Sequence, residues 1–499
     1  MKKIKATIIN PPFVEKPTVG VTIPLGVIYL AGYLRGYGVD VDLIDSQGEG
    51  IFRRSSWYDG TFLIGLPIDE IVSRINPDTD YINVSTNFSP QQRVHLELIK
   101  KIRKRFPDKP IIVGGNDATA HFDVYLKNGA NFAVLGEGEN TLFELVTCLS
   151  RYQDFTKLDG LAWTENGEIK SNKKTKFIQD LDTVPFPARD LIPLENYWKK
   201  LYSHGPVTTK YTPVTFSRGC PLSCSYCSSI VFWQRTWRHR SPKNFVDEIE
   251  ECVTKHGITE FEIMDDNFTL NMSLAVDVCK EIIKRGLGSK IKWSTPNGVR
   301  PEKMNEENLK LFKESGCKYL IFAPESGSQR LLKEVYNKFI DLDLILRNVE
   351  ICHKVGIKTG CFIITGLYVE TDEDFKLTKE YVKKLAKAGL DEAVVFPMLP
   401  YPNTPMTKKY FANIDPVLME QDSGANMNDL PSWYPEREKA NKKIATLYKT
   451  FYIYKSLYHP GKQIRMFKNI LTSKQETKTE RSALALISRF LGITPKATA

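Results

Sequence analysis

The sequence of 499 residues predicts an α/β protein with two successive α/β domains and a helical C-terminal region. Residues 1–150 alternate strand-like and helix-like runs five times, which predicts a doubly wound parallel sheet covered by helices on both faces. Residues 211–400 hold six strand–helix repeats. Polar and glycine-rich residues follow those strands, as at the carboxyl rim of a βα barrel. Residues 151–210 are the connector, and residues 401–499 are the helical, basic region.

The composition indicates a globular protein, with 42% hydrophobic and 26% charged residues. No stretch approaches 18 consecutive apolar residues, so no transmembrane helix is expected. The N-terminal residues lead into a short strand-like run rather than a secretory signal. Six cysteines are scattered singly, mostly in apolar runs, which favours buried free thiols in a reducing compartment. We therefore expect a cytoplasmic protein.

The first domain carries its candidate ligand residues where its strands end. The expected strands are residues 5–9, 39–44, 81–84, 110–113 and 132–135. The expected helices are residues 25–35, 67–75, 91–105, 118–126 and 140–149. Ligands of such sheets bind beyond the carboxyl ends of the strands. The residues found there are Pro11, Pro12, Phe13, Thr86, Asn87, Phe88, Gly114, Gly115, Asn116, Gly136, Glu137 and Gly138.

The character of these residues suits a large planar ligand, because glycines allow its close approach to the backbone. Phe13 and Phe88 are expected to pack on its face. After the domain, Asn166–Gly167 predicts the turn of a β-hairpin. Residues 184–190 are proline-rich and predict a stiff strap without chemistry of its own.

The second domain begins with three cysteines at C-x3-C-x2-C spacing, Cys220, Cys224 and Cys227. Gly219 and Pro221 make this stretch a loop. Thiolates suit iron–sulfur clusters, zinc or copper. The next cysteine is 25 residues on, so a closed four-ligand site is not expected. Three ligands on a four-iron cluster leave one iron open to bind and activate a ligand. The alternatives are three unrelated cysteines or an incomplete zinc knuckle.

With the aromatic Tyr226 before its last cysteine, the loop resembles the radical S-adenosylmethionine (SAM) superfamily. The resemblance implies a partial six-stranded (βα)6 barrel and a [4Fe–4S] cluster whose open iron chelates SAM. The reduced cluster then cleaves SAM to methionine and a 5′-deoxyadenosyl radical. The residues that the resemblance places near SAM are Tyr226, Asp265, Ser294, Arg300, Glu325 and Ser326. The alternative for Asp265 is ordinary helix capping.

The first domain resembles the Rossmann-like cobalamin-binding domain of class B radical SAM methyltransferases. The matching pieces are N-P-P-F at residues 10–13, the helix at 24–34, V-G-G at 113–115 and L-G-E-G-E at 135–139. The resemblance implies that the twelve residues at the strand ends bind cobalamin. No D-x-H-x-x-G motif is present, and neither His95 nor His121 stands in such a context. The alternative is a scaffold that binds no cobalamin.

The C-terminal region holds the net positive charge. Residues 431–499 contain 14 Lys and Arg but only 4 Asp and Glu, whereas the two signs balance over residues 1–430. Residues 436–458 predict a helix, with one face packed on the barrel. Residues 482–491 predict a short amphipathic helix that could contact anionic lipid. We expect no nucleic-acid partner.

The leading hypothesis is a cobalamin-dependent enzyme that methylates an unactivated carbon. By resemblance, one SAM methylates cobalamin, a second yields the radical, and the substrate radical takes the methyl group from methylcobalamin. The alternatives are a ring-forming or rearranging radical enzyme, and a non-catalytic cobalamin or metal sensor. Transfer RNA methylthiolation would need further cluster cysteines in the first domain, where only Cys148 lies. A small-molecule, lipid or peptide substrate and a flavodoxin- or ferredoxin-type electron donor are expected.

Overall fold

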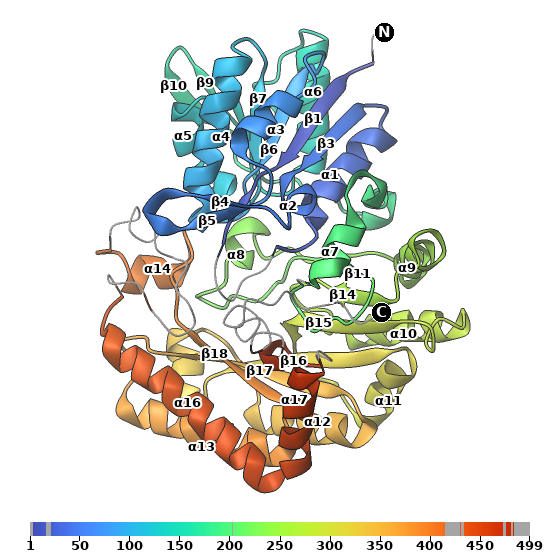
Figure 1. The fold of residues 1–499 in the computed structure, drawn as a ribbon. Helices are drawn as coiled ribbons and strands as arrows, with labels where there is room; N and C mark the ends of the chain where they lie inside the picture. Colours follow the sequence, from blue (N-terminus) through green and yellow to red (C-terminus); the bar gives the residue numbers. More distant parts are fainter. Residues whose placement is uncertain are drawn as a thin grey trace. The chain divides into compact units, whose positions relative to one another are not determined.

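The structure, a computed structural model, divides into two compact units, Met1–Tyr197 and the chain from Trp198 onward. Figure 1 shows the elements of both units in sequence colours. The described residues are 3–15, 21–201, 203–414, 430, 434–472, 476–480 and 483.

The first unit is built on a seven-stranded sheet in the order β10-β9-β8-β7-β6-β1-β3. Five of its strands are parallel, as predicted: β1 (Lys5–Asn10), β3 (Asp40–Asp45), β6 (Tyr81–Ser85), β7 (Ile111–Gly114) and β8 (Phe132–Val134). The predicted hairpin is present as β9 (Leu161–Glu165) and β10 (Glu168–Ser171). It extends the same sheet, because β9 pairs antiparallel with β8.

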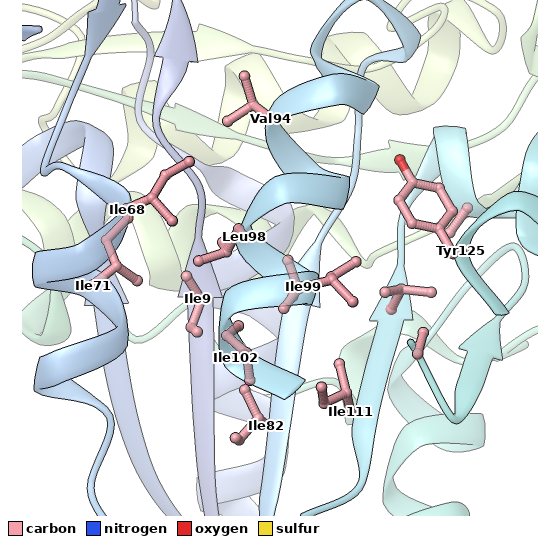
Figure 2. Close-up of a cluster of buried hydrophobic side chains, with 14 of the residues drawn as sticks. Ile9, Ile68, Ile71, Ile82, Val94, Leu98, Ile99, Ile102, Ile111 and Tyr125 are labelled. Carbon is pink, nitrogen blue, oxygen red and sulfur yellow. The ribbon is translucent and has the colours of Figure 1, made fainter. Parts of the chain in front are cut away.

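Helices cover both faces of this sheet, which confirms the doubly wound fold. They are α1 (Leu25–Gly36), α3 (Ile68–Arg74), α4 (Gln92–Arg105), α5 (Asn116–Lys127) and α6 (Glu139–Ser150). Figure 2 shows one face, where side chains of α3 and α4 meet isoleucines of the sheet. In α4 the contacts come from Val94, Leu98 and Ile102, spaced four residues apart. The other face packs α1 and α6.

Several short elements of the first unit were not predicted, because at two to seven residues they are too short to show a clear periodicity. Three strands form a separate antiparallel sheet: β2 (Phe13–Val14), β4 (Arg54–Ser56) and β5 (Phe62–Ile64). The others are α2 (Ser46–Glu49), η1 (Tyr58–Gly60), η2 (Ser89–Gln91), η3 (Leu181–Thr183), η4 (Arg189–Leu191) and α7 (Leu194–Lys200), which straddles the boundary of the units.

The second unit is built on a six-stranded, all-parallel sheet in sequential order, which confirms the partial barrel. Its strands are β11 (Tyr211–Val214), β14 (Glu260–Ile263), β15 (Lys292–Val299), β16 (Cys317–Glu325), β17 (Lys358–Thr365) and β18 (Glu392–Pro397). The register shifts at Trp293–Ser294, near the start of β15, and again toward the carboxyl ends, between Thr295 and Val299 in β15 and between Phe322 and Glu325 in β16. Such irregularities re-aim side chains at the rim, where a ligand would bind.

The helices that follow these strands begin at side-chain caps, which satisfy amide groups of the first turn. They are α9 (Pro242–His256), α10 (Met272–Lys284), α11 (Glu306–Glu314), α12 (Leu342–Val355) and α13 (Asp372–Ala388). Their caps are Ser241, Asn271, Asn305, Asp341 and Thr371. The remaining elements are β12 (Ser217–Arg218), α8 (Ser229–Phe232), β13 (Arg238–His239), the π-helix η5 (Leu331–Val335) and α14 (Pro405–Tyr410).

The C-terminal region forms the predicted helix α16 (Arg437–Tyr458) and an unpredicted helix α17 (Pro460–Leu471). Lysines of both helices pair with carboxylates of the barrel: Lys443 with Glu370 at 2.9 Å and Lys462 with Asp391 at 3.0 Å. Part of the positive charge therefore attaches the region to the barrel. Of the predicted helix at 482–491, only residue 483 is described. None of the described helices is long and apolar enough to cross a membrane.

Candidate functional site

The cysteine loop follows β11 at the carboxyl edge of the six-stranded sheet. Cys220, Cys224 and Cys227 are half-buried free thiols, whereas the five other cysteines of this unit are fully buried, as predicted. Gly219 has φ of +87°, and a Cβ atom there would lie 2.3 Å from the Thr236 carbonyl oxygen. Only glycine fits this conformation, so Gly219 sets the path of the chain into the first cysteine.

The loop is hydrogen-bonded to a segment far along the sequence, at the end of η5. The Ser225 amide donates to the Tyr336 carbonyl oxygen at 2.9 Å, and its hydroxyl donates to the Val335 carbonyl oxygen at 2.7 Å. Asn337 Nδ2 donates to the Ser223 carbonyl oxygen at 2.8 Å. The barrel therefore helps to determine the conformation of the cysteine loop.

The electrostatic setting of the three thiols is mixed. Burial raises the pKa of each, that of Cys227 to about 12, while the positive charge of Arg300 opposes the rise at Cys220 and Cys224. Metal binding would displace the thiol protons.

Among the described residues no three ligating side chains converge as one metal ion requires. A four-iron cluster binds each cysteine to a separate iron, and three thiols in one loop are the donor set that such a cluster with one open iron takes.

A buried polar network lies beside the second and third cysteines. Tyr226 Oη donates to Glu325 Oε1 at 2.8 Å, and Lys338 Nζ donates to the same oxygen at 2.8 Å. Glu325 ends β16 with φ of +62°, a left-handed conformation that non-glycine residues adopt at a cost. The fold thus holds a carboxylate, a phenol and an ammonium next to the cysteine loop, in contact with one another.

The other residues predicted to contact SAM lie in different settings, and their roles stay predictions. Arg300 Nη2 donates to the Phe339 carbonyl oxygen at 2.7 Å. Ser326 is buried and bonds to Thr378 through hydroxyls at 2.9 Å. Ser294 lies in register with Glu262, below the strand end, and its buried hydroxyl has no partner among the described residues.

In the first unit, the strand order β3-β1-β6-β7 puts the topological switch point between β1 and β6. Ligands of such sheets bind at this point. Phe88, after β6, is 55% exposed, whereas Phe13, after β1, is only 8% exposed. The two rings meet edge-on, 6.4 Å between centroids. Phe88 therefore offers its ring to solvent and Phe13 packs against it from within, and the packing of either ring on a ligand stays a prediction.

The loops after β6 and β7 pack tightly against each other. Gly115 has φ of +121°, and a Cβ atom there would lie 2.6 Å from both Asn87 Oδ1 and the Thr86 carbonyl oxygen. Asn116 is exposed at the start of α5. Exposed aromatic surface beside glycine backbone fits a large planar ligand. Pro11 and Pro12 are buried, and Pro11 accepts a hydrogen bond from Gln47 Nε2 at 2.8 Å.

The loop after β8 departs from expectation in one respect. Gly136 and Gly138 flank Glu137, whose buried carboxylate accepts the Ile178 amide at 2.7 Å. This side chain therefore ties the connector to the sheet, a role that was not predicted.

Two buried polar clusters at this edge were missed by sequence reasoning. In the first, Asp117 accepts from Tyr125 Oη and lies 2.9 Å from His121 Nδ1, while His95 Nδ1 lies 3.0 Å from Tyr125 Oη. Burial lowers the pKa of His95 to about 4.

In the second cluster, Asp45 accepts from Asn10 Nδ2 at 2.8 Å and from Tyr197 Oη at 2.8 Å. Burial raises the pKa of Asp45 to about 6. The position of Asp45 at the end of β3 was the only sequence signal that could have pointed to it.

Two family models match the chain: the radical SAM superfamily over residues 214–382 and the B12 binding domain over residues 17–146. The chain is 32% identical to an uncharacterized methyltransferase of Pyrococcus horikoshii, over 83% of this chain and 84% of the relative. It is 30% identical to a cytidylyl-2-hydroxyethylphosphonate methyltransferase of Streptomyces wedmorensis, over 76% of each. It is 27% identical to an anaerobic magnesium-protoporphyrin IX monomethyl ester cyclase of Cereibacter sphaeroides, over 87% of this chain and 68% of the relative.

Among solved structures, a radical SAM methyltransferase from Kitasatospora setae with tryptophan and a SAM analogue superposes with a TM-score of 0.64. It shares 21% identity and covers 81% of this chain and 74% of that one. At this identity the likeness shows a common fold.

Proposed function

Because this chain belongs to the radical SAM enzymes that carry a B12-binding domain, we propose that it methylates an unactivated carbon in a cobalamin-dependent reaction. The observation that carries the proposal is the three-cysteine loop at the barrel rim in a chain that also has the B12-binding sheet. Two relatives of at least 30% identity, matched over three quarters of their length or more, are methyltransferases.

The residues of this chain divide the work between the two units. Cys220, Cys224 and Cys227 would hold the [4Fe–4S] cluster, and Tyr226 and Glu325 stand next to it to orient SAM. When bound, cluster and SAM supply the radical, and cobalamin supplies a methyl group. The edge after β1, β6 and β7 would hold cobalamin through backbone and the exposed ring of Phe88.

A ring-forming reaction is the second candidate, because the cyclase of Cereibacter sphaeroides matches 87% of this chain. Such an enzyme uses the same radical but transfers no methyl group. The two candidates therefore differ in how they consume SAM. A methylase that needs one SAM for the radical and one for the methyl group forms both 5′-deoxyadenosine and S-adenosylhomocysteine.

The test is anaerobic reconstitution of the full chain with iron, sulfide and cobalamin, followed by incubation with SAM, a reductant and small-molecule, lipid or peptide substrates. We expect both adenosine products and a substrate that gains one CH2 unit by mass. Formation of 5′-deoxyadenosine without S-adenosylhomocysteine would support the cyclase instead. If neither product forms in a chain loaded with cobalamin, the sensor hypothesis would stand and the enzyme proposal would fail.

The electron for SAM cleavage must come from a reductant, and we propose a flavodoxin- or ferredoxin-type protein. Replacing a chemical reductant by such a protein in the same assay tests this. Contact between the basic C-terminal region and anionic lipid also remains a proposal, which co-sedimentation with anionic liposomes at low salt tests.

A further inference from the structure

We propose that Asp265 is a positioning residue of the cysteine loop and does not contact SAM. The inference rests on the proposed cluster site and refines it, because Asp265 was expected to bind SAM by family resemblance. Its basis is the set of hydrogen bonds that the carboxylate already makes. They join the end of β14 to the residues that lead into Cys220.

Both carboxylate oxygens of Asp265 are used within the fold. Oδ1 accepts the Phe216 amide at 2.8 Å. Oδ2 accepts the Ser217 amide at 2.8 Å and the Ser217 hydroxyl at 2.5 Å. These donors lie three and four residues before Cys220, so the carboxylate determines where the chain turns toward the first cysteine.

The surroundings of Asp265 leave it facing the interior. The residue is 2% exposed. The ring of Phe216 packs against Phe245 and Phe268, with centroids 5.4 and 5.9 Å away. Three of the roughly four acceptor sites of the carboxylate are therefore occupied within the fold, and its burial leaves little access for a SAM ammonium group.

The next residue shows the opposite orientation. Asp266 is exposed, and its Oδ2 accepts the Ser229 hydroxyl at 3.0 Å, on the far side of the same loop. The two aspartates therefore hold the loop at both ends. Asp265 binds residues 216 and 217 before the first cysteine, and Asp266 binds Ser229 after the last one.

The test compares Asp265→Asn with Glu260→Gln in the full chain. Glu260 is the control, because it is a buried carboxylate at the start of β14 that accepts the Thr208 amide at 2.8 Å and the Thr208 hydroxyl at 2.7 Å, and it also pairs with Lys318 at 2.9 Å. It sits at the other end of β14, away from the loop. In Asp265→Asn one carboxylate oxygen becomes an NH2 group that cannot accept a hydrogen bond, and the remaining amide oxygen is a weaker acceptor. Glu260→Gln makes the same chemical change but leaves the cysteine loop untouched.

After anaerobic reconstitution, we expect Asp265→Asn to retain iron about tenfold less well than wild type against a chelator, the size of loss typical for partners of metal ligands. Glu260→Gln should match wild type. If Asp265→Asn keeps wild-type iron and an unchanged spectrum of the reduced cluster but loses the spectral change on adding SAM, Asp265 is a SAM ligand and the proposal is overturned.

Two further measurements keep the test decisive. Amide hydrogen exchange at residues 216–219 of the metal-free chain should be about tenfold faster in Asp265→Asn, since the bonds to Asp265 are lost whether or not a cluster binds. Unchanged exchange would overturn the inference, while a wild-type chain that binds no iron would overturn only the proposed function.

Should Asp265→Asn not fold, Ser217→Ala removes one of the three donors. A partial loss of iron would support the proposal, and full retention would reject it.

Discussion

The two candidate ligand sites are built in different ways. The cysteine loop of the second unit is held by side chains and backbone from β14, the end of η5 and the start of α14. The edge of the first unit is made mostly of backbone, with a glycine at φ of +121° and one exposed ring. A cluster requires thiolates in fixed directions, whereas a large ligand held by many weak contacts requires a matching shape. The sites should therefore fail independently and for different reasons.

The largest expected effect separates the cluster site from the rest of the molecule. Cys227→Ala should abolish cluster assembly and 5′-deoxyadenosine formation, because a three-ligand site has no spare thiolate. Cobalamin retained on the chain after gel filtration should stay at the wild-type level. Cys148→Ala is the control, since that thiol is also free and half-buried but lies in the first unit. Normal iron content in Cys227→Ala would refute the site.

The reverse separation comes from the glycine after β7. Gly115→Ala places a Cβ atom 2.6 Å from Asn87 Oδ1 in a conformation that only glycine adopts readily. A strain of 1–3 kcal/mol at the ligand edge predicts cobalamin binding about tenfold weaker, with iron content unchanged. Gly38→Ala is matched, because Gly38 also has positive φ but its Cβ atom would meet nothing within 4 Å. Equal cobalamin affinity in both variants would contradict the assignment of this edge.

A third change tests how much the ion pair of Lys338 and Glu325, next to the cysteine loop, contributes to the free energy of unfolding. Lys338→Met leaves Glu325 buried without its cation, 2.8 Å away in the wild type, which predicts a loss of about 3 kcal/mol in the free energy of unfolding. Adding Glu325→Gln in the same chain should recover part of the loss, because no unpaired charge remains. Urea unfolding of the metal-free proteins measures both. A double variant no more stable than the single one would show that the pair is not coupled.

The smallest expected effect concerns acid stability of the first unit. The pKa of His95 is about 4 in the folded chain, against 6.5 for an ordinary histidine. Between pH 4 and pH 6.5 the unfolded chain therefore binds one proton more than the folded chain. The stability that depends on neutral His95 is thus fully present above pH 6.5 and is lost as the pH falls below that value. Between pH 7.5 and 5.5 the contribution is about 1 kcal/mol. His95→Gln should lose less stability over this interval in urea unfolding, and an identical pH dependence in both proteins would contradict the burial argument.

The sequence predicted whichever features depend on local pattern. The spacing of Cys220, Cys224 and Cys227 identified the loop, and alternating strand-like and helix-like runs located the repeats of both sheets. What it did not predict depends on tertiary contacts. Asp265 and Phe216 are 49 residues apart, and Asp45 and Tyr197 are 152 apart. No local pattern pairs such residues, so the roles of Asp265, Glu137 and Asp45 became visible only in the fold.

One contact of the C-terminal region bears on how the protein is made. Glu392, the first residue of β18, accepts the backbone amide of Thr479 at 2.8 Å and that of Lys478 at 3.2 Å. Lys478 lies 86 residues further along the chain. A nascent polypeptide that has just emerged through β18 can supply the Tyr319 hydroxyl to this carboxylate but lacks these two amides until residues 478 and 479 have followed. Iron–sulfur assembly factors that act during translation would meet a barrel whose last strand lacks these C-terminal contacts, so we expect cluster delivery to come after synthesis of this segment.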